Sequence, residues 1–440
     1  MRFSRRVVIG GLLGSSLMST ITKAGTAVEG AAVGRPLPAR VPGELDIHHI
    51  DTGRGNCTLI IGPDGTSVMI DAGASGDQSP AANAPMPDGS MRPGQRQARY
   101  ARRYLVSGAI DYFIATHVHP DHIGDILVDS PAGPDGAFRL TGVSDVDTLL
   151  PIGTVIDRGF PDYGRLSPPD APFARNYLAY LEWRQRTGRS VERAAVGSAN
   201  QIHLSRGASL RILGSSGMLW TGKGESTRSL FPKQAFQMQG GLPNENLLST
   251  SLRLTYGAFS YFTGGDLAND DQDGRYPWLD VETPVVELAG PTEVVSADHH
   301  GYFDACGPNF VRSLDAQVYV IPSWHMSHPG QAQLQRMLGA WNGSQPLRDV
   351  FATNIHPENA TLNSRFIRAL KSTRGHVVVR VAAGGASFRV FVLESSAEQP
   401  RMLSVSGPYR CRESETNSAK VNLSLDGAKL RPQNTGEESR

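Results

Sequence analysis

The sequence has little of what marks several protein classes. Its 440 residues contain 3 cysteines, too few to staple the fold with disulfides. Lys and Arg together number 43 against 42 Asp and Glu, so the formal charge of +1 gives no electrostatic basis for bulk binding to nucleic acid or to an anionic membrane. The sequence has no P-loop, no G-x-S-x-G nucleophile elbow and no repeat of fixed period. The apolar share is ordinary for a globular protein, so the composition alone does not indicate a function.

Residues 1–30 have the character of an export signal. They begin with Ser4-Arg5-Arg6-Val7-Val8-Ile9, continue with a weakly apolar stretch, and reach the small-residue segment Ala24-Gly25-Thr26-Ala27. The paired arginines are typical of a twin-arginine signal peptide. A membrane anchor is the alternative, but the apolar stretch is shorter than a spanning helix needs and is diluted by Gly and Ser. We therefore expect an exported protein, periplasmic or extracellular, with no stable membrane insertion after the signal is removed.

The rest of the chain alternates between strand and helix patterns. Alternating apolar residues and turn signals predict strands and hairpins at 45–49, 58–61 with 67–70, 112–115, 201–214, 251–264, 293–297, 317–322 and 376–381 with 387–393. Helical periodicity indicates helices at 95–106, 173–187, 331–341 and 364–372. Hairpins in both halves with helices between them favour two mixed sheets face to face, with helices outside.

Two segments depart from this pattern. Residues 126–200 are rich in Pro and Gly apart from one helix, so we expect an insert over a working face. Beyond residue 394 the chain is polar and charged, so 395–440 is predicted to be a disordered tail.

Histidine is concentrated just after the strand at 112–115. Thr116-His117-Val118-His119-Pro120-Asp121-His122 places three imidazoles and a carboxylate close together. A loop leaving a strand can splay alternate side chains, so His117 and His119 can point together while Asp121 and His122 reach a second position. Imidazole and carboxylate are suitable ligands for zinc, manganese or iron. Solvated loop histidines are the alternative, but a chance H-x-H-x-D-H run is rare in a chain with 12 His.

This run, placed after an apolar strand, resembles the signature of the metallo-β-lactamase fold superfamily. Three further runs resemble the superfamily's other landmarks in the same order, namely Ile70-Asp71-Ala72-Gly73, Tyr261-Phe262-Thr263-Gly264-Gly265-Asp266 and Asp298-His299-His300-Gly301. With Asn246 and residues 251–257, they are most similar to the hydrolase domain of competence-type DNA-uptake (ComEC-like) proteins. The resemblance implies an α/β (α+β) fold, a four-layer αββα sandwich in a single domain at 43–394, with inserts at about 126–200 and 215–243.

The resemblance also implies two divalent metal ions, with zinc favoured and manganese or iron as alternatives. It assigns His117 and His119 to the first ion. It assigns Asp121 and His122 to the second ion, and Asp266 to a position that bridges the two.

The same resemblance leaves one ligand open and implies one supporting residue. Either His299 or His300 completes the second site. Asp71 would fix a histidine by accepting its other ring proton. The first site usually has a third histidine, but Asn244-Glu245-Asn246 occupies the matching region here. We therefore expect a weak or water-rich first site.

Two such ions can share a hydroxide and clamp both the attacked group and the leaving oxygen. Asp121 would serve as a ligand and also orient that hydroxide. We expect a metal-dependent hydrolase using a metal-bound hydroxide, with a small-molecule or nucleic-acid phosphodiester or phosphate ester as substrate. The alternatives are a lactone, thioester or β-lactam hydrolase of the same fold, and a non-catalytic metal-containing binding protein. The sequence leaves the oligomeric state open.

Two further features lie outside the ligand motifs. His328, in a His-Pro pair after the strand at 317–322, is a candidate for contact with substrate or phosphate, and a purely structural loop histidine is the alternative. Arg96, Arg99 and Arg103 share one face of the helix at 95–106. They could grip a phosphate backbone, although such a stripe is more often a solvated face.

Overall fold

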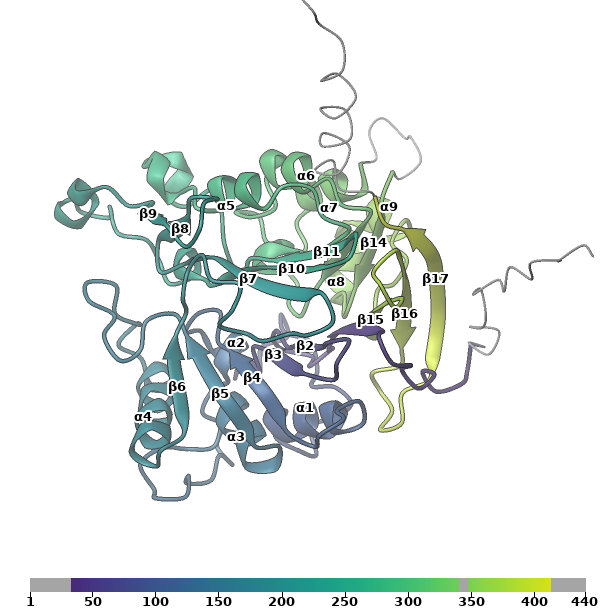
Figure 1. Cartoon of the computed structure of the whole chain (residues 1–440), viewed down its shortest axis with the longest axis horizontal. Helices are drawn as coiled ribbons and strands as arrows, with labels where there is room; N and C mark the ends of the chain where they lie inside the picture. Colours follow the sequence, from purple (N-terminus) through teal and green to yellow (C-terminus); the bar gives the residue numbers. More distant parts are fainter. Residues whose placement is uncertain (1–32, 340–346, 413–440) are drawn as a thin grey trace, which may run out of the picture.

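Two facing β-sheets form the middle of the molecule, and helices cover the outer side of each (Figure 1). The computed structural model describes residues 33–339 and 347–412. The larger sheet has nine strands in the order β17-β16-β15-β1-β2-β3-β4-β5-β6. It is antiparallel from β17 to β3 and parallel from β3 to β6. Its strands are β1 (Leu45–His49), β2 (Thr58–Ile61), β3 (Ser67–Ile70), β4 (Ile110–Ile114), β5 (Ile152–Asp157), β6 (Ser190–Arg193), β15 (His376–Val381), β16 (Ser387–Leu393) and β17 (Met402–Arg410).

The second sheet has eight strands in the order β14-β13-β12-β11-β10-β7-β8-β9. It is parallel from β14 to β11 and antiparallel from β11 to β9. Its strands are β7 (Ala208–Ser215), β8 (Met218–Trp220), β9 (Thr227–Ser229), β10 (Ser251–Tyr256), β11 (Phe259–Thr263), β12 (Val294–Ser296), β13 (Val318–Ile321) and β14 (Asp349–Ala352).

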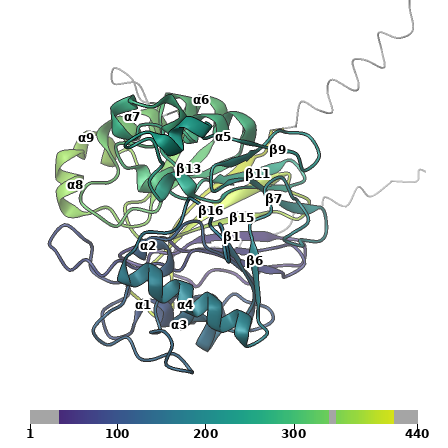
Figure 2. The ribbon, with the colours of Figure 1, turned by 90° about the vertical axis from the view of Figure 1, so that its left-hand side faces the viewer.

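The helices form two outer layers, as the views from two sides show (Figures 1 and 2). The nine-stranded sheet is covered by α1 (Pro93–Arg102), α3 (Gly142–Leu149) and α4 (Pro172–Arg186). The eight-stranded sheet is covered by α5 (Glu282–Ala289), α6 (Pro308–Leu314), α7 (Gln331–Leu338), α8 (Pro357–Leu362) and α9 (Ser364–Ile367). The short α2 (Pro120–Ile123) lies at the sheet edge, and 3₁₀ turns occur at Lys233–Gln237, Asn246–Leu248, Gln272–Gly274, Pro277–Leu279 and Asp298–Gly301.

Neighbouring residues of the strands enter different apolar layers because side chains alternate across a sheet. In β4, Ile114 faces the core between the sheets, whereas Phe113 packs under the helices of the nine-stranded sheet. In β13, Val318 and Val320 face the core between the sheets, and Tyr319 faces the opposite helices. Three apolar layers therefore hold four layers of structure together. The predicted fold class, a mixed α/β protein with an αββα arrangement, is confirmed.

The two predicted inserts belong largely to the sheets. Residues 126–200 supply α3, β5, α4 and β6, so they extend the nine-stranded sheet by two parallel strands. Residues 215–243 contribute β8 and β9 to the edge of the other sheet. β5 carries Gly153, whose backbone faces the carbonyl of Asp111 too closely for a side chain. That glycine weakens the strand pattern in the sequence.

Two other boundaries differ from the prediction. The segment from residue 395, which was expected to be a disordered tail, contains the strand β17. This strand is polar and half-exposed, and it pairs with β16. The hairpin expected at 201–214 is a single strand, β7, which pairs with β10 and β8. Edge strands with little apolar content are hard to distinguish from loops in a sequence.

Some expectations concern the ends of the chain and its cysteines. The predicted signal peptide at 1–30 and the part of the tail at 413–440 lie outside the described residues. Among the helices that the structure describes, none is long and apolar enough to cross a membrane. Cys57, Cys306 and Cys411 are free thiols. Cys57 and Cys306 belong to the two different helix-covered layers, which keeps them apart.

The carboxyl ends of five strands, which precede the sequence motifs, meet at one edge of the sandwich. The chain leaves β3 at Asp71 and β4 at Thr116, and it leaves β11, β12 and β13 just before Asp266, Asp298 and Trp324. The carboxyl ends of parallel strands lie at the same edge of a sheet, which is where open α/β folds commonly place a ligand site.

The packing between the sheets predicts a large stability cost at Phe259. This residue of β11 is buried and its ring meets that of Phe388 in β16 edge to face, with centroids 5.4 Å apart. We expect Phe259→Ala to lower the free energy of unfolding by about 3–5 kcal/mol because it leaves a cavity between the sheets. Denaturant unfolding measures this. The same change at Phe303, which is 64% exposed, should cost less than about 0.5 kcal/mol. Equal costs would contradict the assigned core.

A buried histidine between the sheets predicts a dependence of stability on pH. His49 of β1 is buried edge-on to the ring of Tyr261, and burial lowers its pKa to about 3. Below pH 6.5 the unfolded chain binds a proton at this position that the folded chain does not, so stability falls as the pH falls. His49→Leu should remove this loss.

Urea unfolding of wild type and His49→Leu at pH 7.5 and 4.5 provides the measurement. Between pH 7.5 and pH 4.5, wild type should lose about 1–2 kcal/mol more unfolding free energy than His49→Leu loses. His203→Leu, at an exposed position, should leave the difference between the two pH values unchanged. Parallel pH profiles for wild type and His49→Leu would show that His49 is not the group responsible.

Candidate metal centre

The His-rich loop turns sharply into the one-turn helix α2. Pro120 occupies the first helical position, where its missing N–H costs nothing, and Asp121 follows in the first turn. The loop lies tightly against the segment that follows β3. A Cβ atom on Gly73 would lie 1.9 Å from the backbone of Asp121, so only glycine permits this approach. The close contact sets the position of Asp121 and His122.

Four side chains from both sheets bring their donor atoms together at this edge. One ligand atom each from Asp121, His122, Asp266 and His300 lies within 4.8 Å of the others. His122 Nε2 is 3.1 Å from Asp266 Oδ1, and His300 Nε2 is 3.1 Å from Asp121 Oδ2. Two imidazoles and two carboxylates are a donor set that suits a divalent transition metal. The residues predicted for the second ion therefore fit one.

Three histidines of this edge share a second feature, which is an Nδ1 atom held by an oxygen. His122 Nδ1 lies 2.7 Å from Asp71 Oδ2, His299 Nδ1 lies 2.7 Å from Asp304 Oδ1, and His300 Nδ1 lies 2.9 Å from the Pro322 carbonyl. A ring that donates its Nδ1 proton to an oxygen presents the lone pair of Nε2 on the other side. Such partners orient and tune metal-binding histidines.

His117 and His119 face each other beside this group. His117 Nε2 is 3.0 Å from His119 Nδ1 and 3.9 Å from Asp266 Oδ2, and His117 Nδ1 lies 3.2 Å from the Ser249 hydroxyl. Burial lowers the pKa of both imidazoles, so both are neutral at physiological pH. Two neutral ring nitrogens at this separation suit two ligands of one ion.

The structure places both late histidines at the centre. His299 and His300 have φ values of 45° and 56°, a left-handed backbone that is strained for these residues and turns both rings inward. His300 belongs to the four-residue donor group. His299 Nε2 instead lies 3.8 Å from Asp266 Oδ2 and 3.2 Å from Asn246 Nδ2.

Asn246 lies where the sequence predicted a weak ligand. Its Nδ2 contacts His299, and its buried Oδ1 has no hydrogen-bond partner among the described residues. An amide oxygen is an acceptable but weaker ligand than imidazole. The amide that stands in place of the expected third histidine therefore lies beside His299, whose Nε2 is 3.8 Å from Asp266 Oδ2.

The charges of the centre are strongly coupled. Burial on its own would raise the pKa of the Asp266 carboxyl, but His122, His300 and His299 hold it well below its usual range. Burial would likewise lower the pKa of His122, but Asp266, Asp71 and Asp121 hold it well above its usual range, so a metal ion at Nε2 would displace a proton. Opposite charges thus stabilise each other in a place where an isolated charge would be costly.

Sequence reasoning missed the residues that hold these ligands in place. The buried Glu245 accepts the backbone N–H of Val118 at 2.8 Å and binds the guanidinium of the buried Arg158 at 2.7 Å through each oxygen. It thereby anchors the loop between His117 and His119. Glu245 lies next to Asn246 in the motif already noted, but Arg158 has no signal in the sequence that points to this partner.

His328 lies behind the donor group and outside it. Its ring stacks on that of His300, with centroids 5.0 Å apart, and its Nδ1 accepts the Trp324 N–H at 3.4 Å. Trp324 Nε1 reaches His300 Nε2 at 3.3 Å. Burial lowers the pKa of His328 well below its usual range, so the ring is neutral. Its contacts within the described residues are those of a support for His300.

The tether on His122 generates a prediction about metal affinity. Asp71 accepts hydrogen bonds from Thr116 N, Thr116 Oγ1 and Asn56 Nδ2 as well as contacting His122. Asp71→Asn removes one of its acceptor oxygens, so we expect zinc affinity to fall about 10–100-fold. Competition with a chromogenic chelator measures it. Asp111→Asn, at the start of β4, should leave the affinity unchanged. Wild-type affinity in Asp71→Asn would show that the tether does not orient a ligand.

Comparison with known proteins agrees with this arrangement over part of the chain. A search of curated proteins found no match. Among solved structures, a protein of Parabacteroides distasonis, whose role as a metal-dependent hydrolase is itself inferred, matches with 9% identity and a TM-score of 0.33. The match covers 70% of this chain and 92% of that one, and a likeness this weak carries no argument. Residues 50–128, which include Asp71 and the run from His117 to His122, match the family model of the metallo-beta-lactamase superfamily.

Proposed function

We propose that this protein is a metal-dependent hydrolase of phosphodiesters or phosphate esters. The observation that carries the proposal is the convergence of Asp121, His122, Asp266 and His300, whose donor atoms lie within 4.8 Å of one another. The match of residues 50–128 to the superfamily model supports a metal-dependent hydrolase in general terms. The phosphate ester preference rests on the likeness of the motifs to ComEC-like hydrolase domains.

The proposal assigns two groups of ligands that share Asp266. Asp121, His122 and His300 would hold one divalent ion, and His117 and His119 would hold the other. Divalent ions in such a site polarise the attacked ester and make a water molecule acidic enough to attack at neutral pH. Zinc is favoured because neutral imidazole and carboxylate are its common ligands, with manganese or iron as alternatives.

The protein's own groups complete the reaction. The Asp121 side chain is 15% exposed while that of His122 is fully buried, so Asp121 is the ligand that can also orient a water molecule. The His299 side chain is 16% exposed against 3% for His300. Burial alone would lower the pKa of His299, but Asp266 and Asp304 raise it, so the ring can carry a second proton on Nε2 while Asp304 holds Nδ1. His299 would deliver that second proton to the leaving oxygen. We therefore assign His300 as the ligand and His299 as the proton donor.

The remaining parts of the proposal concern substrate and location. A small phosphodiester and single-stranded DNA are both suitable substrates, and a lactone, thioester or β-lactam hydrolase is the competing chemistry for the same ligands. Fold alone does not separate these reactions. Export through a twin-arginine signal stays a prediction from residues 1–30.

The test is a panel of esters with a variant at the facing pair of histidines. We expect bis(4-nitrophenyl) phosphate or single-stranded DNA to be hydrolysed with Zn²⁺ or Mn²⁺ added, and His119→Ala to lower kcat/KM at least about 100-fold. His203→Ala, at an exposed position outside the donor group, should retain full activity. Metal content is measured on every variant in parallel.

Each outcome separates the candidates. Hydrolysis of nitrocefin or a lactone without phosphodiesterase activity would identify the carbon-centred alternative. Metal bound at full occupancy without turnover on the whole panel would favour the non-catalytic binding protein. Unchanged activity in His119→Ala would overturn the assigned site.

A further inference from the structure

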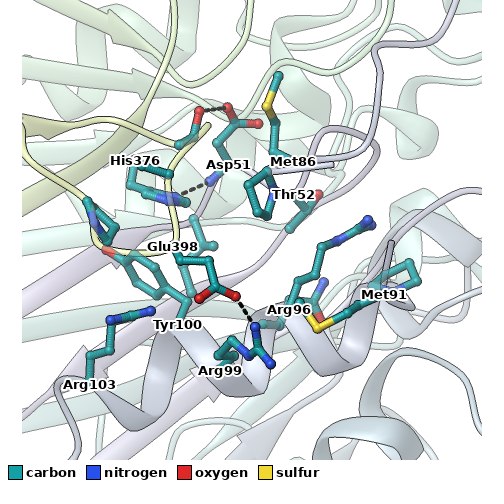
Figure 3. Close-up of a pocket in the computed structure, with 17 residues that line it drawn as sticks. Asp51, Thr52, Met86, Met91, Arg96, Arg99, Tyr100, Arg103, His376 and Glu398 are labelled. Atoms are coloured by element: carbon teal, nitrogen blue, oxygen red, sulfur yellow. Dashed lines mark hydrogen bonds and ion pairs between the residues drawn. The ribbon is translucent and has the colours of Figure 1, made fainter. Parts of the chain in front are cut away.

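The arginine face predicted on α1 lies apart from the donor group. Arg96, Arg99 and Arg103 line a cavity to which no residue of that group contributes (Figure 3). The cavity has a volume of about 40 Å³, which is far smaller than most small-molecule sites. Arg96 donates a hydrogen bond to the carbonyl of Asp88, and Arg99 binds Glu398 (Figure 3). The protein itself supplies partners for these arginines, so we assign no phosphate to this face.

The other predicted phosphate contact, His328, is also engaged. Its Nδ1 accepts the backbone N–H of Trp324, and its ring stacks on that of His300. The group that points at a metal ligand from this loop is instead the indole of Trp324. Trp324 Nε1 lies 3.3 Å from His300 Nε2, the atom that faces Asp121 Oδ2 at 3.1 Å. The loop after β13 therefore presents an N–H donor at the donor group.

The indole N–H has this acceptor only while the lone pair of His300 Nε2 is free. His300 Nδ1 lies 2.9 Å from the Pro322 carbonyl, which can only accept a hydrogen bond, so Nδ1 carries the ring proton and Nε2 the lone pair. The indole can only donate, so its proton points at that lone pair. A metal ion held by His300 uses the same lone pair. The N–H of Trp324 then needs another acceptor at the centre.

Backbone and ring contacts hold the indole in this direction. The Trp324 N–H donates to His328 Nδ1 at 3.4 Å, and the Trp324 carbonyl accepts the N–H of Asn83 at 2.9 Å. The indole meets the rings of His325 and His328 edge to face, with centroids 5.5 and 5.3 Å apart. Trp324 is half-buried, so a ligand can approach it. A donor that is already oriented needs no rearrangement to bind a charged oxygen.

We propose that the indole N–H of Trp324 donates a hydrogen bond to a phosphate oxygen of the substrate at the ion that His300 holds. This inference rests on the proposed function, which supplies the ion and the phosphate. The oxygens of a phosphate carry negative charge, and a hydrogen bond to a charged acceptor is stronger than one to a neutral acceptor. Trp324 is thus a substrate contact, whereas the contacts of His328 support His300.

Calorimetric titration of the zinc-loaded full chain with inorganic phosphate tests the proposal without turnover. Two variants remove the donor, namely Trp324→Phe and the replacement of Trp324 by 3-benzothienylalanine, in which sulfur takes the place of the N–H in a ring of nearly the same shape. We expect both to bind phosphate at least about 10-fold more weakly than wild type. Both should bind zinc at least as tightly, because the N–H no longer competes for the His300 lone pair.

A matched control and an activity measurement complete the experiment. Trp220→Phe removes an indole N–H that donates to the Gly224 carbonyl at 2.8 Å, and it should bind phosphate like wild type. For bis(4-nitrophenyl) phosphate, kcat/KM of the two Trp324 variants should fall at least about 10-fold. Thermal unfolding midpoints verify that each variant is folded.

The outcomes separate this inference from the proposed function. Wild-type phosphate affinity in the folded benzothienylalanine variant would overturn the inference. A loss of zinc affinity that accounts for the weaker phosphate binding would also overturn it, because Trp324 would then only support His300. Hydrolysis of phosphodiesters by a wild type that binds no phosphate would overturn the inference and leave the proposed function standing. Phosphate binding that depends on Trp324, in a protein that hydrolyses no ester, would support the contact and contradict the proposed function.

Discussion

The carboxylate of Asp266 is the point on which the candidate centre depends. Its oxygens lie 3.1, 3.5, 3.8 and 3.9 Å from ring nitrogens of His122, His300, His299 and His117. Two of these imidazoles come from the nine-stranded sheet and two from the eight-stranded sheet. A buried carboxylate surrounded by imidazoles is tolerable only if the imidazoles share protons with it or share a cation. The buried Asp266 carboxylate therefore requires imidazoles from both sheets, so the candidate metal centre forms only where the two sheet edges meet.

Anchors within each sheet hold this meeting point in place. Asp71 binds His122 from behind, and Glu245 binds the backbone of the His-rich loop while it pairs with Arg158. A buried ion pair such as Glu245 with Arg158 is weak evidence for stability, since the desolvation of both charges opposes their attraction. Its geometric effect is more direct, because it fixes Val118 between two histidines whose ring nitrogens are 3.0 Å apart. These contacts between protein groups thus orient the ligand atoms.

The sequence predicted the parts of the fold whose patterns are local. The strands at 45–49 and 58–61 and the helix at 173–187 follow from periodicity, and β1, β2 and α4 match them closely. β5 and β17 were missed because a glycine or a polar surface hides the alternation. The structure brings the seven predicted ligands to one edge, which the motifs allowed us to expect. The partners Asp304, Ser249 and Arg158 join the centre only through tertiary contacts, so no local pattern could reveal them.

The two proposed ions would have different numbers of strong protein ligands, and this bears on how each ion would be held. Asp121, His122, Asp266 and His300 supply four charged or imidazole donors, so an ion on that side needs little from solvent. On the other side, His117 and His119 lie beside Asp266, and the amide of Asn246, whose oxygen is a weaker donor than imidazole, contacts His299. An ion with fewer strong protein ligands keeps open positions for water or for substrate oxygens. The two non-bridging oxygens of a phosphodiester share a negative charge and could occupy such positions. Under the proposed function, the weak amide ligand would therefore leave room at this ion for an oxygen of the phosphate group.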